Sequence, residues 1–321
     1  MSTSASRPVE RVGSSTAVPA RAVGRSTAGR PGGTARVVRT RPDRRVPIQD
    51  RMTPARWVIW AAMVLGGLVM VFPVYWVFVT AISPGGLAQT SGFSLWPHRV
   101  DLGVFAKAFA DQPVLTWLVN SVVIAVAGVV ISVFISVLAG YAFAKFSFRG
   151  RNLLFGAMLV TIMVPIQVVM VPEFVIISKL GLVGTPWAVI LPSAAQAVSI
   201  FMARQYIQAI PTELIEAARV DGAGEFRTFR TVVLPACGPL VAVLTILTFV
   251  WRWNDFVWPL VALQKPESYT ISVGLSSLNG SYSHPWDEIM AITLISMIPV
   301  MVVFFVFQRQ FVQGIAESGI K

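Results

Sequence analysis

The chain has 321 residues, of which 55% are hydrophobic and 13% are charged, and its mean hydropathy is +0.69. This composition excludes an ordinary soluble domain and is typical of a protein that crosses a membrane several times. The formal net charge of +11 invites a nucleic-acid interpretation, but twelve arginines and three acids fall within residues 1–56. Because the excess charge is confined to one end, with no aromatic-rich soluble domain beside it, we predict no nucleic-acid partner.

Residues 1–56 contain no leucine and no aromatic residue, and they are rich in Arg, Ser, Thr, Ala, Gly and Pro. Such a segment cannot bury enough apolar surface to fold. We predict a disordered, Arg-rich cytoplasmic tail, whose charge holds this end of the chain inside and can contact anionic membrane lipid. An organellar transit peptide is the alternative, because such peptides are also rich in Arg and Ser and poor in acids.

We predict an all-α membrane protein with six transmembrane helices. The expected spans are 57–82, 115–144, 152–178, 186–203, 236–261 and 289–307. Segments 83–114 and 262–286 are expected outside, the first with a short helix near Phe105, and 309–321 is expected to form a cytoplasmic tail. The second span ends in small residues that suit close helix packing. They are Ala139, Gly140, Ala142 and Ala144.

The third expected span carries an internal repeat, Met163-Val-Pro165 and Met170-Val-Pro172. Because each proline removes a backbone donor, we predict a bent or broken helix here. Pro165 and Pro172 are candidates for a translocation path, since broken membrane helices line polar cavities, although kinks that serve packing explain the same residues. Glu173 is a functional candidate at membrane depth and an interfacial residue if it lies at the outer surface.

The longest polar segment between the apolar blocks is 211–235. Pro211 suits a first helical position, and the early acids favour a helix N-terminus. Gly222 can adopt the left-handed conformation that ends a helix. One face of the helix carries apolar or small residues at helical spacing. These are Leu214, Ala217 and Ala218.

A second short helix is expected after Gly222, with apolar residues on one side and arginines on the other. The apolar residues are Phe226, Phe229 and Val233, and the arginines are Arg227 and Arg230. Segment 211–235 is therefore predicted to be a helix-turn-helix that presents a small apolar surface. The alternative is an amphipathic helix that lies on the membrane surface.

Six spans place both termini on one side of the membrane, and the distribution of cations indicates which side. The segments on the side of the N-terminus carry Lys145, Arg149, Arg151, Arg204, Arg219, Arg227, Arg230, Arg309 and Lys321. The opposite segments carry the smaller set Arg99, Lys107, Lys179 and Lys265. The positive-inside rule therefore places both termini and segment 211–235 in the cytoplasm.

Residues 251–260, Trp-Arg-Trp-Asn-Asp-Phe-Val-Trp-Pro-Leu, combine charges with aromatic rings. Arg252 and Asp255 lie three residues apart and can pair on one helix face, or Arg252 can extend toward the interface. Trp253, Asn254 and Asp255 are candidates for the translocation path, because a sugar path needs flat apolar faces beside hydrogen-bonding groups. The alternative is an anchor at the outer interface, where tryptophans are common.

Segment 211–235 contains Glu216-Ala217-Ala218, then Gly222, then Val232-x-Leu234-Pro235. This spacing resembles the EAA loop of ABC-importer permeases, E-A-A-x3-G-x9-I-x-L-P, with Val232 in place of Ile. The resemblance implies that the loop docks into a cleft on a separate ATPase subunit. The coupling residues that it implies are Glu216, Ala217, Ala218, Asp221, Gly222, Leu234 and Pro235.

Other stretches also resemble this family. They are W-N-D-F-x-W-P-L at 253–260, residues 272–275, residues 308–314 and Gly319-Ile-Lys321. They are similar to the carbohydrate-uptake branch, and specifically to the second permease of the maltose transporter. The resemblance covers 57–321 and implies a type-1 permease domain at 115–308. Ile320 replaces the usual Val and the final Gly is absent, which puts a contact of this tail with the ATPase in doubt.

The resemblance implies one non-enzymatic permease subunit of an importer for a sugar or sugar derivative in the plasma membrane. The implied partners are a homologous second permease, an ATPase dimer and an extracytoplasmic sugar-binding protein. ATP and Mg²⁺ are expected on the ATPase, because this chain has no P-loop, and no cofactor or metal is expected on the chain itself. Its single cysteine, Cys237, excludes an intramolecular disulfide.

An ion-coupled secondary transporter is the alternative function, with Glu173 and Asp255 as relay groups. Such transporters often show a two-fold repeat of their spans, which this sequence lacks. A membrane-embedded enzyme or anchor is a third class. It is disfavoured because His98 and His284 fall in external segments and no cluster of residues has metal-ligand spacing. We therefore predict no catalytic residue.

Overall fold

The computed structural model describes residues 54–84, 95–97, 99–279 and 286–318, and of residues 309–318 it describes the backbone. The chain divides into residues 1–55 and a compact unit of residues 56–321. The predicted disordered tail therefore lies outside the described residues except at 54–56, which begin the first helix. The motif at 319–321 also lies outside them.

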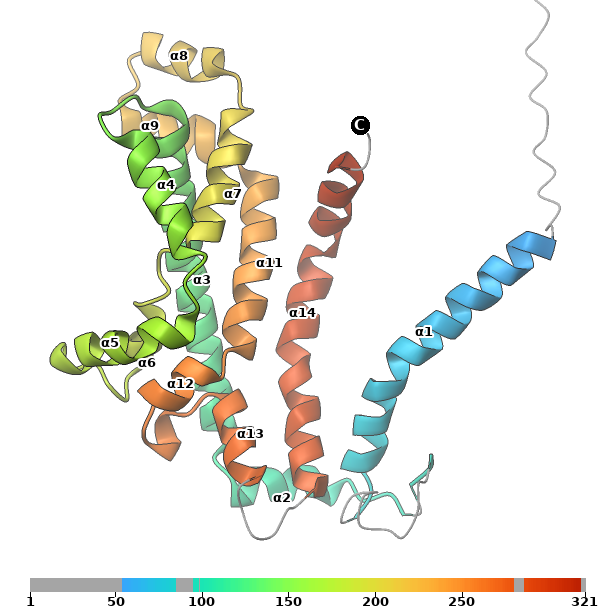
Figure 1. Ribbon diagram of the computed structural model, residues 1–321. Helices are drawn as coiled ribbons and strands as arrows, with labels where there is room; N and C mark the ends of the chain where they lie inside the picture. The colour runs from blue at the N-terminus through green and yellow to red at the C-terminus, as the bar shows by residue number, and fades with distance from the viewer. Residues whose placement is uncertain (1–53, 85–94, 98, 280–285, 319–321) are drawn as a thin grey trace, which may run out of the picture. The chain divides into compact units, whose positions relative to one another are not determined.

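Every regular element in the described part of the chain is a helix, as predicted (Figure 1). The elements are α1 (Pro54–Ala81), α2 (Gly103–Asp111), α3 (Val114–Lys145), α4 (Arg151–Thr161), α5 (Ile166–Lys179), α6 (Pro186–Ile190), α7 (Ala197–Gln208), α8 (Thr212–Val220), α9 (Glu225–Thr228), the π-helix η1 (Phe229–Val233), α10 (Leu234–Ala236), α11 (Gly238–Asn254), α12 (Val257–Ala262), the 3₁₀ helix η2 (Pro266–Ser268), α13 (Ile271–Asn279) and α14 (Trp286–Ser318). The predicted short helix near Phe105 is α2.

Long apolar helices are fewer than the six predicted spans. Within the described residues, three helices are long and apolar enough to cross a membrane, namely α1, α3 and the first part of α14. Two pairs of helices are each bent at a short break. The number of candidate spans rises to five if each of these pairs counts as one span. The predicted span at 186–203 is instead divided between α6 and α7. Pro192 follows α6 and cannot donate a backbone hydrogen bond, which accounts for the interruption.

The predicted break in the third span is confirmed. Helices α4 and α5 are bent by 103° at the break. The bend lies at Pro165, which has an extended backbone and precedes α5. Pro172 lies inside α5, which continues through it. Of the two prolines in the repeat, Pro165 therefore marks the break.

The predicted end of the fifth span is wrong. The fifth span, expected at 236–261, ends at Asn254 because Asp255 has an extended backbone, and α12 then forms a separate short helix. The sixth expected span, 289–307, agrees with the candidate span Trp286–Gln308, and its helix α14 continues to Ser318 into the predicted tail. Local hydropathy shows where apolar residues gather, but it does not show where the backbone turns within an apolar run.

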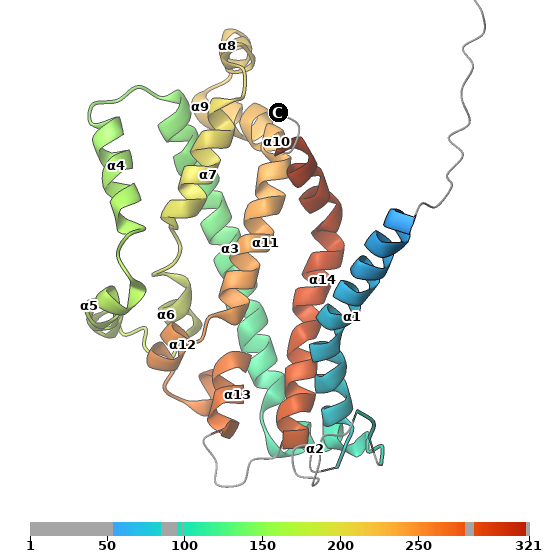
Figure 2. The ribbon, with the colours of Figure 1, turned by 45° about the vertical axis from the view of Figure 1, so that its right-hand side comes forward.

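Helix α3 packs against α7 and α11 (Figures 1 and 2). Gly140 permits the approach of α7, because a Cβ atom there would lie 2.5 Å from the Cβ of Ala203 and 2.9 Å from backbone atoms. The predicted role of small residues in this part of α3 is thus confirmed at Gly140. At the other end of α3, a Cβ on Gly274 of α13 would collide with the ring of Trp117.

Helix α1 is exposed along residues 54–74, and its buried residues, Val79, Thr80 and Ala81, lie at its C-terminal end. That end packs with Val104 of α2 and Ala291 of α14. An ion pair also joins these elements, since Lys107 Nζ lies 2.5 Å from an oxygen of the buried Glu288. This hydrogen bond with Glu288 raises the pKa of Lys107.

We predict that Gly140→Ala destabilises the protein, because the added methyl group meets helix backbone that cannot move aside. Overpacking of this kind costs about 1–3 kcal/mol. Gly156→Ala in α4 is the matched control, because nothing lies within 4 Å of an added Cβ there. Thermal unfolding of the detergent-solubilised protein should shift downward for Gly140→Ala alone. Equal unfolding temperatures for the two variants would contradict the close contact.

Candidate functional site

Helix α8 lies at one end of the helical bundle, with α2 at the other end (Figures 1 and 2). It begins at Thr212, one residue later than predicted, and Pro211 precedes it. The helix ends as predicted, because Gly222 has a φ of 80°. The N–H groups of Gly222 and Ala223 donate to the carbonyls of Arg219 and Ala218, which satisfies the end of the helix.

The two sides of α8 have different surroundings. Ile215 is 1% exposed and belongs to the hydrophobic core. In contrast, Leu214 is 51% and Val220 is 88% exposed, and Ala217 between them is also exposed. These three residues recur at intervals of three and form an apolar stripe that no other part of the described chain covers. The predicted apolar face is confirmed at Leu214 and Ala217, but Ala218, which was expected with them, is half-buried, and the roles of Val220 and the buried Ile215 were missed.

The two ends of α8 are tied to α3 by polar contacts. At the start, Lys145 Nζ donates to the carbonyl of Ile210 at 2.6 Å and to Thr212 Oγ1 at 3.3 Å. At the end, Arg219 Nε lies 2.9 Å from Glu225 Oε1, and the Tyr141 hydroxyl donates to Glu225 Oε2 at 3.3 Å. The hydrogen bond with Glu225 raises the pKa of Arg219. These contacts hold α8 against the cytoplasmic end expected for α3.

The segment after Gly222 forms α9, η1 and α10 and then turns by 78° into α11. Phe229 and Val233 are 2% and 0% exposed, while Arg227 and Arg230 are exposed, as predicted for two opposite sides. Phe226 was expected with the apolar side, but it is 66% exposed. The π-helical turn precedes Pro235, whose missing N–H cannot complete an α-helical bond.

The residues expected to contact the ATPase divide by exposure. Those exposed to solvent are Glu216, Ala217, Asp221, Gly222 and Pro235. Ala218 is half-buried, and Leu234 packs against the hydrophobic core. Of the exposed group, Glu216 and Ala217 lie on α8 and Asp221 and Gly222 at its end, while Pro235 lies on α10 beside Leu234.

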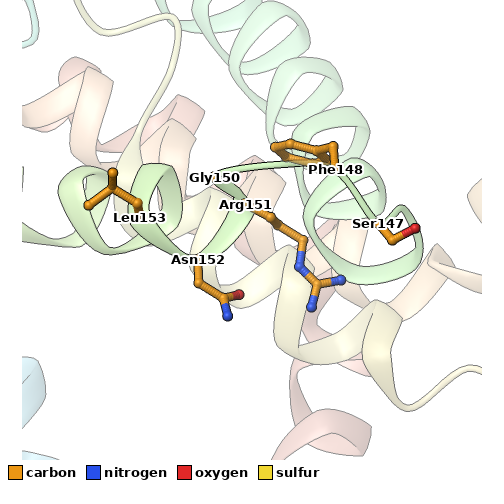
Figure 3. A pocket seen from close by; sticks show the side chains of 6 residues that line it. All are labelled: Ser147, Phe148, Gly150, Arg151, Asn152 and Leu153. Atoms are coloured by element: carbon orange, nitrogen blue, oxygen red, sulfur yellow. The ribbon is translucent and has the colours of Figure 1, made fainter.

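A small hollow of about 280 Å³ lies at the turn between α3 and α4 (Figure 3). It is lined by residues 147, 148 and 150–153. Gly150 has a φ of 82°, and Arg151 Nη1 donates to the carbonyl of Phe146 at 3.0 Å. The hollow contains none of the predicted site residues, and we assign it a role in the turn alone.

A larger cavity of about 450 Å³ lies where α4, α5, the 192–198 segment, the end of α11 and α12 meet. Asp255 lines it, together with Glu173 from α5. Val164 and Ile166, on either side of Pro165, line it as well. The break in the third span therefore borders a cavity whose lining is mostly apolar and includes two carboxyl groups.

The other predicted path residues lie elsewhere. Trp253 is buried against α14, where its Nε1 donates to the carbonyl of Ser296 at 3.0 Å. Asn254 is exposed, and its Nδ2 donates to Val250 of its own helix at 2.8 Å. Pro172 is exposed on α5. The structure thus brings Asp255 together with Glu173 and does not bring Trp253, Asn254 or Pro172 into the cavity lining.

Arg252 holds one wall of this cavity. It is 6% exposed and, instead of pairing with Asp255 along the helix, donates to the carbonyls of Val189 at 3.3 Å and Ser193 at 2.6 Å and to the Ser193 hydroxyl. Space for the guanidinium comes from Gly128 of α3, where a Cβ atom would lie 3.1 Å from it. The buried arginine thus satisfies backbone carbonyls where the fourth predicted span is interrupted.

A span that breaks beside a cavity, and a helix outside the spans with an exposed apolar stripe, are features expected of the membrane subunit of a transport system. Sequence comparison agrees with this class. The family model described as "Binding-protein-dependent transport system inner membrane component" matches residues 132–317, and the chain belongs to this family. It is therefore a multi-pass membrane protein, and the resemblance to ABC-importer permeases is confirmed.

Curated relatives carry the names of transport permeases. The chain is 34% identical over 268 residues to the arabinooligosaccharides transport system permease protein AraQ of Halalkalibacterium halodurans, covering 83% of this chain and 96% of the relative. It is 34% identical to the lactose transport system permease protein LacG of Rhizobium radiobacter, covering 81% and 95%. It is 32% identical to the sn-glycerol-3-phosphate transport system permease protein UgpE of Pectobacterium atrosepticum, covering 80% and 94%.

A solved structure has the same fold. A chain of a bacterial ABC transporter involved in the import of the acidic polysaccharide alginate matches with a TM-score of 0.68 at 28% identity, covering 79% of this chain and 95% of that one. A chain of a bacterial alginate ABC transporter in complex with a pentasaccharide-bound periplasmic protein matches with a TM-score of 0.58 at 15% identity, which supports the fold.

We predict that Glu225→Gln loosens the end of α8, because it weakens the contact with Arg219. An exposed ion pair is worth about 0.2–1 kcal/mol, so amide hydrogen exchange at 217–223 should become up to roughly fivefold faster. Glu213→Gln is the control, since it removes an exposed acid from the first turn of the same helix. Unchanged exchange in Glu225→Gln would show that the pair does not hold the helix.

Proposed function

We propose that this chain is one permease subunit of an ATP-driven importer that moves a sugar or sugar derivative across the plasma membrane. The observation that carries the proposal is the exposed apolar stripe of α8, formed by Leu214, Ala217 and Val220, on a helix anchored at both ends. The names of its relatives, which include permeases for arabinooligosaccharides and lactose, support the substrate class.

The stripe suits a cleft on an ATPase subunit. It is flanked by the exposed carboxylates Glu213 and Glu216, so a cleft with an apolar floor and cationic rim would match it. A movement of that cleft acts on Ile215 and on the contacts of Lys145 and Glu225, which connect α8 to α3. The ATPase drives the permease through differential contact with α8 in its two nucleotide states.

The other partners that we propose are a second permease, an ATPase dimer and a sugar-binding protein. Residues 54–74 of α1 are exposed apolar helix, which suits contact with lipid and with a homologous second permease. The described residues hold up to five candidate spans, which would form part of a path that a second permease completes. An ATPase dimer would hold ATP and Mg²⁺ inside, and a sugar-binding protein would deliver the substrate outside. This chain then needs no cofactor of its own.

The orientation that we propose places α8 and both termini in the cytoplasm. The arginines and lysines around α8 support it, because Lys145, Arg219, Arg227 and Arg230 all lie at this end. The ion-coupled alternative is disfavoured, since the chain belongs to a family of binding-protein-dependent permeases. Under our proposal Glu173 and Asp255 line the path and do not relay protons.

We predict that Gly222→Pro abolishes uptake while the protein still inserts into the membrane. Proline fixes φ near −65°, whereas Gly222 has a φ of 80°, and it also removes the N–H that donates to Arg219. Uptake is measured in proteoliposomes that contain the full complex and its binding protein. Uptake at the wild-type rate would remove the coupling role of this turn.

We also predict that Glu216→Lys abolishes uptake, because it reverses the charge beside the apolar stripe without changing the helix. Asp111→Lys in α2 is the matched control, since Asp111 is exposed at the opposite end of the bundle. Membrane insertion should be normal in both variants. If Glu216→Lys and Asp111→Lys transport equally well, the acidic flank of α8 is not part of the docking surface.

A further inference from the structure

The acidic and basic side chains in the described lining of the cavity beside the broken third span are all carboxyl groups. Glu173 and Asp255 both line it, and they are close enough for the charge of Asp255 to act on Glu173. Its described lining contains no lysine, arginine or histidine. A solute in the cavity therefore meets carboxylates and no cationic side chain of this chain.

The neighbouring guanidinium does not reverse this balance. Arg252 is 6% exposed and is committed to the carbonyls of Val189 and Ser193 and to the Ser193 hydroxyl. It acts on Asp255 from behind the cavity wall. Even when Arg252 is counted, the carboxyl groups around the cavity outnumber the cationic side chains by two to one.

The rest of the lining suits a polyhydroxylated solute. Gln196 and Ser193 offer an amide and a hydroxyl, and Trp251 and Trp258 contribute aromatic surface. Carboxylates and amides accept hydrogen bonds from sugar hydroxyls, while aromatic faces cover the C–H side of a ring. A volume of about 450 Å³ is enough for a small saccharide.

We propose that this cavity admits uncharged and cationic sugars and disfavours sugars that carry a phosphate or carboxylate. The inference rests on the proposed import function and narrows its substrate class. Membership of the family does not determine the charge of the substrate. Its relatives are named for lactose and for glycerol phosphate, and a structural neighbour is named for an acidic polysaccharide. In a cavity of low dielectric, repulsion between like charges is strong enough to decide between such solutes.

Three sugars of equal size test the proposal: galactose, galacturonate and galactosamine, which carry charges of zero, minus one and plus one. Binding is measured by saturation-transfer NMR on the chain in lipid nanodiscs, with whatever subunits copurify, at a pH where the amine is protonated. We expect galacturonate to bind about tenfold more weakly than galactose or worse, and galactosamine to bind at least as well as galactose.

The variant Glu173→Gln/Asp255→Asn keeps the size of both side chains and removes their charge. It should bring the three sugars to similar affinities. The control Asp111→Asn/Glu267→Gln removes two exposed acids outside the cavity and should keep the wild-type order.

Equal or tighter binding of galacturonate to the wild type would overturn the proposal. So would an unchanged order in the cavity variant, or the absence of binding by all three sugars. The measurement does not require the ATPase. A chain that shows the expected order but purifies without an ATPase would therefore contradict the proposed import function and leave the selectivity of the cavity in place.

Discussion

The close approach of neighbouring helices to α3 is the constraint on which both functional regions depend. At Gly140 the backbone of α7 comes so near that a methyl group has no room. At Gly128 the missing side chain makes space for the guanidinium of Arg252. At the outer end expected for α3, Trp117 packs against Gly274 and its Nε1 donates to the carbonyl of Pro266 at 2.9 Å. One helix therefore positions the rest of the bundle through sites where glycine is required.

This arrangement connects the two regions physically. The C-terminal end of α3 holds α8 through Lys145 and Tyr141, and its middle holds the wall of the cavity through Gly128 and Arg252. The helix between these points is continuous from Val114 to Lys145. Under the proposed function, a movement of α8 would reach the cavity wall along this continuous helix.

Local sequence patterns predicted the features that depend on nearby residues. The left-handed Gly222, the break at Pro165 and the close packing at Gly140 follow from the chemistry of single residues or short spacings. Features that depend on distant residues were missed. For Arg252 the sequence offered a pair with Asp255 or an extension toward the interface, but its partners Val189 and Ser193 lie 63 and 59 residues earlier in the chain. Likewise, periodicity along α8 could not show that Ile215 is the residue that faces the core.

The central claim is that the exposed face of α8 is the docking surface for an ATPase. Affinity purification of the tagged chain from its native membrane tests it directly, with Ala217→Trp on the stripe and Ala106→Trp on the exposed surface of α2 as control. The account predicts that the wild type and the control retain an ATPase and a second permease, while Ala217→Trp keeps the permease and loses the ATPase. An ATPase retained by Ala217→Trp, or a wild-type chain that purifies and transports alone, would contradict it.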